Sequence, residues 1–425
     1  MLQNRTTGEK VLSVAGTDRS STADLITDLV NIAVYSTVLG MPQYNSLESF
    51  YAQLVSSGKL GSGEPITVTG HSLGGFLTQA FTARHTSVVS AAYTYNSPGF
   101  GTAEQLLGFF GFTDWPAAAA KITNVHATNG VSMTAGLGVM LGTSQPVKIE
   151  ADTNPLNNHS VVALGDALAI YETYSRLQTD ISISQAGALF ASSGIEDRRL
   201  EAALDTLRTV FIGAASNDAN TTPTGNRDQF YLNLQALQNN ATFKDMSGQV
   251  KLVLANPGFA WLGQSDTDTA LAYRFALLEL QPFAVVASTN AQNQILYGCY
   301  TQRLSLFDPQ SGQGELTASW MRDRAAMLNV VVKANSGNEN FVYDSALIEG
   351  TFFEDVATGT SRLAAAGQGT APQRFVTFGG EGADTLPGAG RSDALYGGGG
   401  ADTLTGLGGN DYLEGNAGAD SLGGG

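Results

Sequence analysis

The stretch Gly70-His71-Ser72-Leu73-Gly74 is the part of the chain best suited to nucleophilic chemistry. A β-branched run, Ile66–Thr69, precedes it, and apolar residues at helical spacing follow it from Phe76 to Phe81. A serine hydroxyl is a weak nucleophile, so it must stand on a tight strand-to-helix turn where a histidine can take its proton and backbone N–H groups face the reacting carbonyl. The flanking glycines leave room for that turn. The pattern therefore predicts a nucleophilic serine rather than an ordinary glycine-rich turn.

The general base can be sought by elimination, because the chain has only four histidines. His71 adjoins the serine and should point away from it, and His85 lies at the far end of the following helix. His126 falls inside a predicted strand, where a structural histidine is the commoner outcome. His159 follows the last predicted strand of this region and precedes a helix, which fits the order serine, acid, histidine. We therefore predict Ser72 as the nucleophile and His159 as the general base.

The C-terminal end carries a second pattern, with a period of nine residues. Aspartates recur in one register, and a leucine follows each of them two positions later. Carboxylates and the carbonyls of glycine turns are hard oxygen ligands, so the pattern is typical of a calcium-binding β-roll. A flexible glycine linker would show neither regularity. The second repeat departs from the pattern at Ala389 and Arg391, so we expect a weaker site there. The predicted calcium ligands are Asp384, Asp393, Asp402, Asp411, Asp420, Gly380, Gly382, Gly398 and Gly400.

Composition limits the function. The chain has 425 residues, 43% of them hydrophobic, and a formal net charge of −16. This charge argues against nucleic acid or an anionic membrane surface as the main partner. A single cysteine, Cys299, excludes an internal disulfide framework and a cysteine-rich zinc site. We find no apolar run long enough for a transmembrane segment and no N-terminal signal-peptide pattern, which fits a cytosolic protein or one exported without a cleaved signal.

Strands and helices alternate through the first part of the chain, which indicates an α/β fold with a mostly parallel sheet. We expect a loop through Met41-Pro42. The predicted strands are Lys10–Ala15, Ile66–Thr69, Ala91–Tyr95, Ile122–Ala127 and Val147–Ala151. The predicted helices are Leu25–Ala33, Ser46–Ser56, Glu104–Phe110 and Val161–Leu177.

Three motifs in this order resemble the class 3 lipases of the α/β-hydrolase fold, over about residues 9 to 175. They are Val14-Ala15-Gly16-Thr17, the run from Val68 to Gly75, and Tyr95-Asn96-Ser97-Pro98-Gly99. The resemblance implies ester hydrolysis through an acyl-enzyme. It also implies an oxyanion hole formed by Thr17 and the backbone N–H of Leu73.

The acid of the triad is where the sequence departs from this family. The carboxylates between Ser72 and His159 are Glu104, Asp114, Glu150 and Asp152. In the family the acid follows the strand after the Asn-Ser-Pro-Gly turn, but here that strand is followed by Asn129 and Gly130. Asp152 shares a loop with His159 and is the favoured acid. Asn129 is the alternative, because an amide oxygen can also hold the imidazole tautomer, and a decayed, inactive site is the third possibility.

These patterns divide the chain into an α/β-hydrolase domain over residues 1–180, a mixed linking or lid-bearing region of unknown role over 181–375, and a parallel β-roll over 376–425. We expect helices at Ile195–Phe211 and Ala270–Leu280 in the linking region, which resembles the linkers of large calcium-repeat exoproteins. The repeats stop at Gly423-Gly424-Gly425, so we expect a truncated array that lacks a C-terminal secretion signal.

Two functions follow. The first is a secreted, extracellular serine ester hydrolase with structural calcium. The repeats resemble those of exoproteins exported by a Gram-negative one-step secretion machinery, and this resemblance implies the same route here. The substrate of the hydrolase would be a triacylglycerol, a phospholipid, a polyester or another ester, met at an interface. The alternative is a calcium-repeat surface or adhesive protein that carries an inactive hydrolase-like domain. The acid position and a covalent label on Ser72 distinguish the two.

Overall fold

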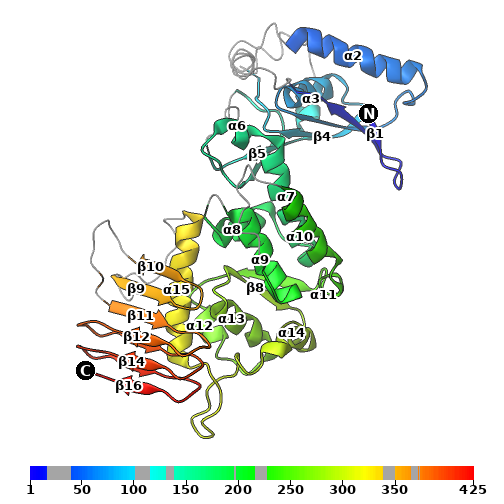
Figure 1. Ribbon diagram of the computed structural model, residues 1–425. Coiled ribbons are helices and arrows are strands. Elements are labelled where there is room, and N and C mark those ends of the chain that lie inside the picture. The colour runs from blue at the N-terminus through cyan, green and yellow to red at the C-terminus, as the bar shows by residue number, and fades with distance from the viewer. Residues whose placement is uncertain are drawn as a thin grey trace. The chain divides into compact units, whose positions relative to one another are not determined.

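The computed structural model describes residues 1–16, 40–100, 115–130, 138–195, 198–215, 227–337, 350–364, 372 and 374–425. The chain forms two compact units (Figure 1). Unit 1 comprises Met1–Tyr171 and Ser182–Gly187, and unit 2 comprises Glu172–Ile181 and Ala188–Gly425. In the described ranges, no helix has the length and apolar character needed to cross a bilayer.

Unit 1 is built on a six-stranded sheet whose strands lie side by side in chain order. The first pair is antiparallel and every later pair is parallel, which confirms the prediction of a mostly parallel sheet. The strands are β1 (Leu2–Gln3), β2 (Lys10–Val14), β3 (Ile66–His71), β4 (Val89–Tyr95), β5 (Ile122–Ala127) and β6 (Thr143–Val147). Because parallel strands share one carboxyl edge, the residues that follow β3, β4 and β5 meet at that edge.

The helices of this region are α2 (Gly40–Ser56), α3 (Leu73–Arg84), α5 (Trp115–Ala119), α6 (Pro155–His159) and α7 (Val161–Leu177). Helix α3 follows β3 and is buried along nearly its whole length. Its apolar side chains, including Phe76, Leu77 and Phe81, join those of β2 and β3 in one core. The predicted helices Leu25–Ala33 and Glu104–Phe110 lie outside the described residues.

Two predicted boundaries in unit 1 are wrong. The loop expected at Met41-Pro42 is the first turn of α2, where a proline is tolerated because the first N–H groups of a helix have no partner within it. The strand expected at Val147–Ala151 ends at Val147, which pairs with Ala127. Beyond it, the backbone of Ile149 bonds to a side chain instead of a strand.

Unit 2 begins with a helical region that also contains an antiparallel pair of strands, β7 and β8. The helices and strands that follow α7 and precede the C-terminal strands are α8 (Ile183–Ser193), α9 (Arg199–Ile212), α10 (Arg227–Asn239), α11 (Ala241–Asp245), β7 (Val250–Leu254), α12 (Phe259–Leu262), α13 (Asp268–Leu278), β8 (Phe283–Ala287), α14 (Asn290–Tyr297), η1 (Gly298–Tyr300) and α15 (Ala318–Ser336). The helices predicted at Ile195–Phe211 and Ala270–Leu280 correspond to α9 and α13, with boundaries shifted by one to four residues.

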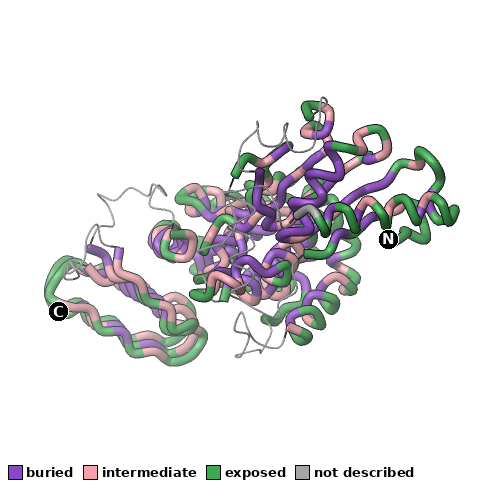
Figure 2. Tube along the Cα trace, turned by 90° about the horizontal axis from the view of Figure 1, so that it is seen from above, coloured by how far each residue is buried: buried purple, intermediate pink, exposed green. Residues whose placement is uncertain are grey.

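The C-terminal strands of unit 2 form two sheets (Figure 1), in which every pair is parallel except the antiparallel pair of β10 and β9. One sheet has the order β10-β9-β11-β13-β15 and the other the order β12-β14-β16, so successive nine-residue repeats alternate between the sheets. Leu386, Leu395 and Leu404 form the core between them, with Leu413 packed against it. Figure 2 shows buried strand residues beside exposed turns in this part. The strands are β9 (Thr351–Asp355), β10 (Thr360–Ala364), β11 (Arg374–Phe378), β12 (Thr385–Pro387), β13 (Ala394–Tyr396), β14 (Thr403–Thr405), β15 (Tyr412–Glu414) and β16 (Ser421–Gly423).

Candidate functional site

Ser72 stands on a tight turn between β3 and α3. Its backbone has φ 57° and ψ −125°, a conformation that residues with a side chain rarely adopt. The turn brings strand and helix together so closely that a Cβ on Gly70 would lie 2.2 Å from the Gly74 carbonyl oxygen, and a Cβ on Gly74 would lie 2.3 Å from that of Val14. Only glycine fits at either position, which is the steric reason for the Gly-x-Ser-x-Gly spacing.

The structure brings Ser72 and His159 together. The His159 Nε2 atom lies 3.0 Å from the Ser72 Oγ atom, and the two residues are only 4% and 3% exposed. His159 is the last residue of α6, which begins with Pro155 and is capped by the Asn154 side chain. The contact joins residues 87 positions apart in the chain and has the geometry that a general base needs to take the serine proton.

The other three histidines have different surroundings. His85 caps the end of α3, and its Nε2 atom lies 2.9 Å from a carboxylate oxygen of Glu48. His126 lies within β5, with its Nδ1 atom 3.4 Å from the Asn124 carbonyl oxygen. His71 does not contact the serine hydroxyl with its ring, and instead its Nε2 atom lies 2.8 Å from the His159 carbonyl oxygen. This contact was not anticipated from the sequence.

The predicted oxyanion hole is described in part. Leu73 is the first residue of α3, so its backbone N–H has no partner within the helix. Gly16 lies against the same turn, because a Cβ there would be 3.6 Å from the Ser72 Cβ atom. Thr17, the next residue and the second predicted donor, lies outside the described residues.

The structure does not bring the Asp152 carboxylate to the imidazole. Its hydrogen bonds stay within its own loop, with the Asn154 backbone N–H donating to Oδ1 at 2.8 Å and Asn157 Nδ2 donating to Oδ2 at 2.7 Å. The bond from the Asn154 backbone, followed by that from Asn157, lowers the pKa of the Asp152 carboxyl below its usual range. Asp152 therefore organises the loop that leads into α6.

The Asn129 side chain is also engaged elsewhere. Its Oδ1 atom accepts from the Ile149 N–H at 2.7 Å, and its Nδ2 atom donates to the Ile149 carbonyl at 2.5 Å. Beyond the ends of β5 and β6, the Asn129 side chain thus takes the place of a paired strand backbone. It holds the segment that precedes Asp152.

Glu150 is a third carboxylate in this segment, and sequence reasoning passed over it. It follows Ile149, whose backbone is bonded to the Asn129 side chain, and is 3% exposed. A carboxylate this deeply buried is costly unless it is paired, so its burial marks a polar environment at this edge of the sheet. The apolar residues on both sides, Ile149 and Ala151, were the available signal of a buried position. Glu104 and Asp114 lie outside the described residues.

The five predicted calcium aspartates occupy equivalent turns of the roll. In three of them the side chain links turns on the same edge, as each Oδ1 accepts the backbone N–H of the aspartate 18 residues earlier: Asp402 from Asp384, Asp411 from Asp393 and Asp420 from Asp402, at 2.8 to 3.0 Å. Within the part of the chain that the structure describes, the second oxygens of Asp402 and Asp411 are buried without a hydrogen-bond partner. A buried, unpaired carboxylate oxygen fits a hard cation such as calcium.

The glycines between these aspartates let the turns stack. A Cβ on Gly398 would lie 2.3 Å from the Gly380 carbonyl oxygen, and one on Gly400 would lie 2.5 Å from that of Gly382. Their φ angles, 92° and 118°, are in the range that favours glycine. Burial, followed by repulsion from Asp420 and Asp384, raises the pKa of the Asp402 carboxyl. A bound calcium would be held by these carboxylates together with turn carbonyls, and would offset that repulsion.

The comparisons with known proteins concern this end of the chain. Two overlapping segments, residues 378–409 and 387–422, match the family model for the RTX calcium-binding nonapeptide repeat (4 copies). The search of curated proteins finds no match for the chain. RTX repeats bind calcium structurally and are typical of secreted proteins. The C-terminal residues 378–422 are therefore RTX calcium-binding repeats.

Proposed function

We propose that this protein is a secreted serine hydrolase that cleaves carboxylic esters, with Ser72 as the nucleophile and His159 as the general base. The observation that carries the proposal is the 3.0 Å contact between Ser72 Oγ and His159 Nε2 on a turn with strained backbone. Both side chains are buried at the carboxyl edge of a parallel sheet, which is where α/β enzymes place their sites.

The reaction would proceed in two steps. The Ser72 oxygen attacks the ester carbonyl while His159 Nε2 takes its proton, and the tetrahedral oxyanion is stabilised by the Leu73 N–H and by Thr17. His159 then gives the proton to the leaving alcohol, and the acyl group remains on Ser72. In the second step water attacks the acyl-enzyme, His159 again takes and returns a proton, and the carboxylic acid leaves.

The RTX repeats support export, because proteins with such repeats are typically secreted. We propose that a Gram-negative one-step machinery exports the chain, and that the repeats fold in extracellular calcium. The substrate class within this proposal is a lipid or another ester with an apolar acyl chain, including phospholipids and polyesters.

One observation favours a second candidate, a calcium-repeat surface protein with an inactive hydrolase-like domain. Asp152 and Asn129 were expected to orient the imidazole. Asp152 instead directs its oxygens to groups of its own loop, and Asn129 directs its oxygen to the Ile149 backbone N–H. Neither of these two side chains therefore supplies the acceptor that was expected to fix the tautomer of the imidazole.

A chain-length series of p-nitrophenyl esters separates the two candidates. The full chain in millimolar calcium is compared with Ser72→Ala and with His85→Ala, a histidine on the same unit that faces Glu48. An ester hydrolase turns over at least one ester, loses the activity in Ser72→Ala and keeps it in His85→Ala. Equal background rates for all three proteins would support the inactive domain instead.

A further inference from the structure

We propose that His71 and Asn96 are positioning residues for His159, because both hold its backbone carbonyl. This inference rests on the proposed function. His71 Nε2 lies 2.8 Å from the His159 carbonyl oxygen, and Asn96 Nδ2 donates to the same oxygen at 3.1 Å. A carbonyl oxygen can only accept, so His71 must carry its proton on Nε2.

The two hydrogen bonds from His71 and Asn96 to the His159 carbonyl oxygen act as a clamp, and the local structure shows why it is needed. Helix α6 has only five residues, and His159 is the last of them, so its carbonyl has no partner within the helix. The two donors come from the ends of the neighbouring strands β3 and β4. They bind the loop that carries the general base to the sheet that carries the nucleophile.

Asn96 is itself held firmly. It is fully buried, its Oδ1 accepts from the Ala127 N–H at 2.9 Å, and its own N–H donates to the Val125 carbonyl at 2.9 Å. Its φ of 44° is in the left-handed region, which asparagine tolerates better than most residues. The side chain therefore joins the end of β5 to the His159 carbonyl.

The two residues His71 and Ser72 contact both ends of His159. Ser72 Oγ faces the imidazole, while the His71 side chain faces the carbonyl and packs its ring 5.0 Å from the His159 ring. The backbone turn that presents the nucleophile thus also fixes the distance to its base. A misplacement of about 1 Å at such a contact can reduce the rate by about 100-fold.

Kinetics of His71→Phe and His71→Gln test the clamp. The phenylalanine keeps the ring packing but has no donor, whereas the glutamine amide can still donate to the carbonyl. We expect kcat of His71→Phe to fall by about 10- to 100-fold with little change in KM, and that of His71→Gln to recover most of the loss. Asn96→Asp, which keeps the acceptor for Ala127 but removes the donor, should behave like His71→Phe.

A second measurement distinguishes failure of the clamp from failure of the proposed function. Nitrogen-15 spectra of the histidines in the full chain report the tautomer without any substrate. The clamp requires the Nε2–H form of His71, and the Nδ1–H form would contradict it whatever the activity. If His71 is the Nε2–H tautomer but Ser72 shows no reactivity, the proposed function is wrong. The clamp is then only a structural contact. Equal kcat for both His71 variants and the wild type would overturn the positioning role.

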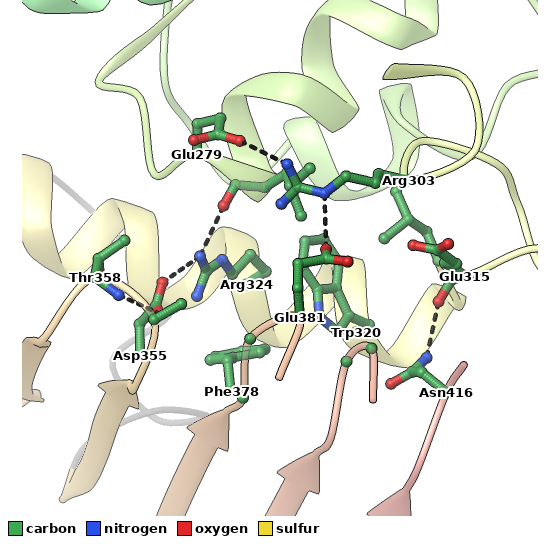
Figure 3. A pocket seen from close by; sticks show the side chains of 17 residues that line it. Glu279, Arg303, Glu315, Trp320, Arg324, Asp355, Thr358, Phe378, Glu381 and Asn416 are labelled. Carbon is green, nitrogen blue, oxygen red and sulfur yellow. Dashed lines mark hydrogen bonds and ion pairs between the residues drawn. The ribbon is translucent and has the colours of Figure 1, made fainter. Parts of the chain in front are cut away.

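A separate observation carries a second inference, in unit 2. We infer that the guanidinium groups of Arg303 and Arg324 provide at the first layer of the roll the positive charge that calcium provides at later layers. Arg324 Nη2 lies 2.5 Å from Asp355 Oδ2, and both residues are buried. Arg303 Nε lies 2.8 Å from Glu381 Oε1. Both pairs line one cavity of about 120 Å³ (Figure 3).

Strand pairing places these acids at the start of the roll. Strand β9 lies beside β11 with Asp355 opposite Phe378, so the turn after Asp355 lies beside the first repeat turn, which contains Glu381, and we count these two turns together as the first layer. Arg324 also donates to the Leu277 and Leu278 carbonyls, and its guanidinium lies 4.8 Å from the Phe378 ring centroid. These carbonyl groups at the end of α13 thus hold the Arg324 guanidinium in place.

Among the described residues, no ion pair involves Asp402 or Asp411 of the later layers. The second oxygens of Asp402 and Asp411 are buried and unpaired within the described residues. The carboxylates of the first layer are therefore compensated by the chain itself, while those of later layers need an added cation. This difference predicts a first layer that stays folded without calcium.

Hydrogen exchange of the full chain, with calcium and after its removal, tests this inference. Amides of β9 and β11 should stay protected in both conditions, whereas those of β13 to β16 should lose protection without calcium. Arg324→Met and the milder Arg303→Gln should extend the loss to β9 and β11, while Arg362→Gln, on β10 of the same sheet, should not. Equal loss across all layers of the wild type would overturn the inference, as would unchanged exchange of β9 and β11 in both variants.

Discussion

The Ser72–His159 site and the RTX roll differ in whether the chain itself supplies partners for their buried polar groups. At the serine site the hydroxyl, the imidazole and the histidine carbonyl are all engaged by atoms of the chain. In the roll, one buried carboxylate oxygen of Asp402 and one of Asp411, the Oδ2 atoms, have no hydrogen-bond partner among the residues that the structure describes. The comparison teaches that the first site is organised by the fold alone, while the second is completed by calcium.

The strongest test of the first half of this comparison is Ser72→Ala. We expect the esterase activity of the full chain to fall by up to about a million-fold, because the nucleophile is lost while the fold is kept. Thermal unfolding should change little, as the hydroxyl is small and leaves no large cavity. Activity above a tenth of the wild-type value would make Ser72 a bystander.

Substitution of Asp152 tests whether this residue orients His159. If Asp152 orients His159 in the substrate complex, Asp152→Asn should reduce kcat by up to about 10,000-fold, the loss expected for a wrong tautomer. Its hydrogen bonds to Asn154 and Asn157 indicate a loop role instead, for which the loss should be much smaller and accompanied by lower thermal stability.

Two further variants complete this series. Asn129→Asp should preserve or raise activity if Asn129 holds the acid position, because a carboxylate stabilises the imidazolium better than an amide. It should lower stability if Asn129 serves only to clamp Ile149, since the carboxylate cannot donate to that carbonyl. Glu150→Gln tests the buried carboxylate that the structure adds. Unchanged kcat in all three variants would show that none of these three residues orients His159.

Calcium removal tests the contrast between the two regions directly. In calcium-free protein the repeat carboxylates repel one another, so the β-structure signal of the roll should fall and β13 to β16 should exchange rapidly. The serine site contains no predicted calcium ligand, so the initial esterase rate should change little. A roll that is equally ordered with and without calcium would contradict this half of the comparison.

A smaller effect is expected from pH. Because burial raises the pKa of Asp402, the folded turn favours the protonated acid. Its contribution to stability is therefore full at pH values below the unfolded pKa and is lost as the pH rises through the folded pKa. Calcium-free protein should thus gain protection at this turn on acidification, with Asp384 and Asp420 as the facing charges. Asp402→Asn should remove that dependence.

The sequence predicted the parts of the molecule that depend on local geometry. The glycines around Ser72 and the aspartates of the roll have spacings fixed by one turn, so their arrangement could be deduced from the chain. The contacts of Asp152, Asn129 and His71 could not, because each depends on how separate loops meet at the carboxyl edge of the sheet. The end of β6 was misjudged for the same reason, since a side chain continues the ladder there.

The most direct test of the central claim is covalent labelling with a fluorophosphonate probe. Ser72 activated by His159 should be labelled in the full chain, with the modified peptide containing Ser72, and labelling should be lost in Ser72→Ala and nearly lost in His159→Ala. His85→Ala should be labelled like the wild type. No labelling of folded wild-type protein, or labelling that persists in Ser72→Ala, would contradict the assignment of Ser72 as the nucleophile.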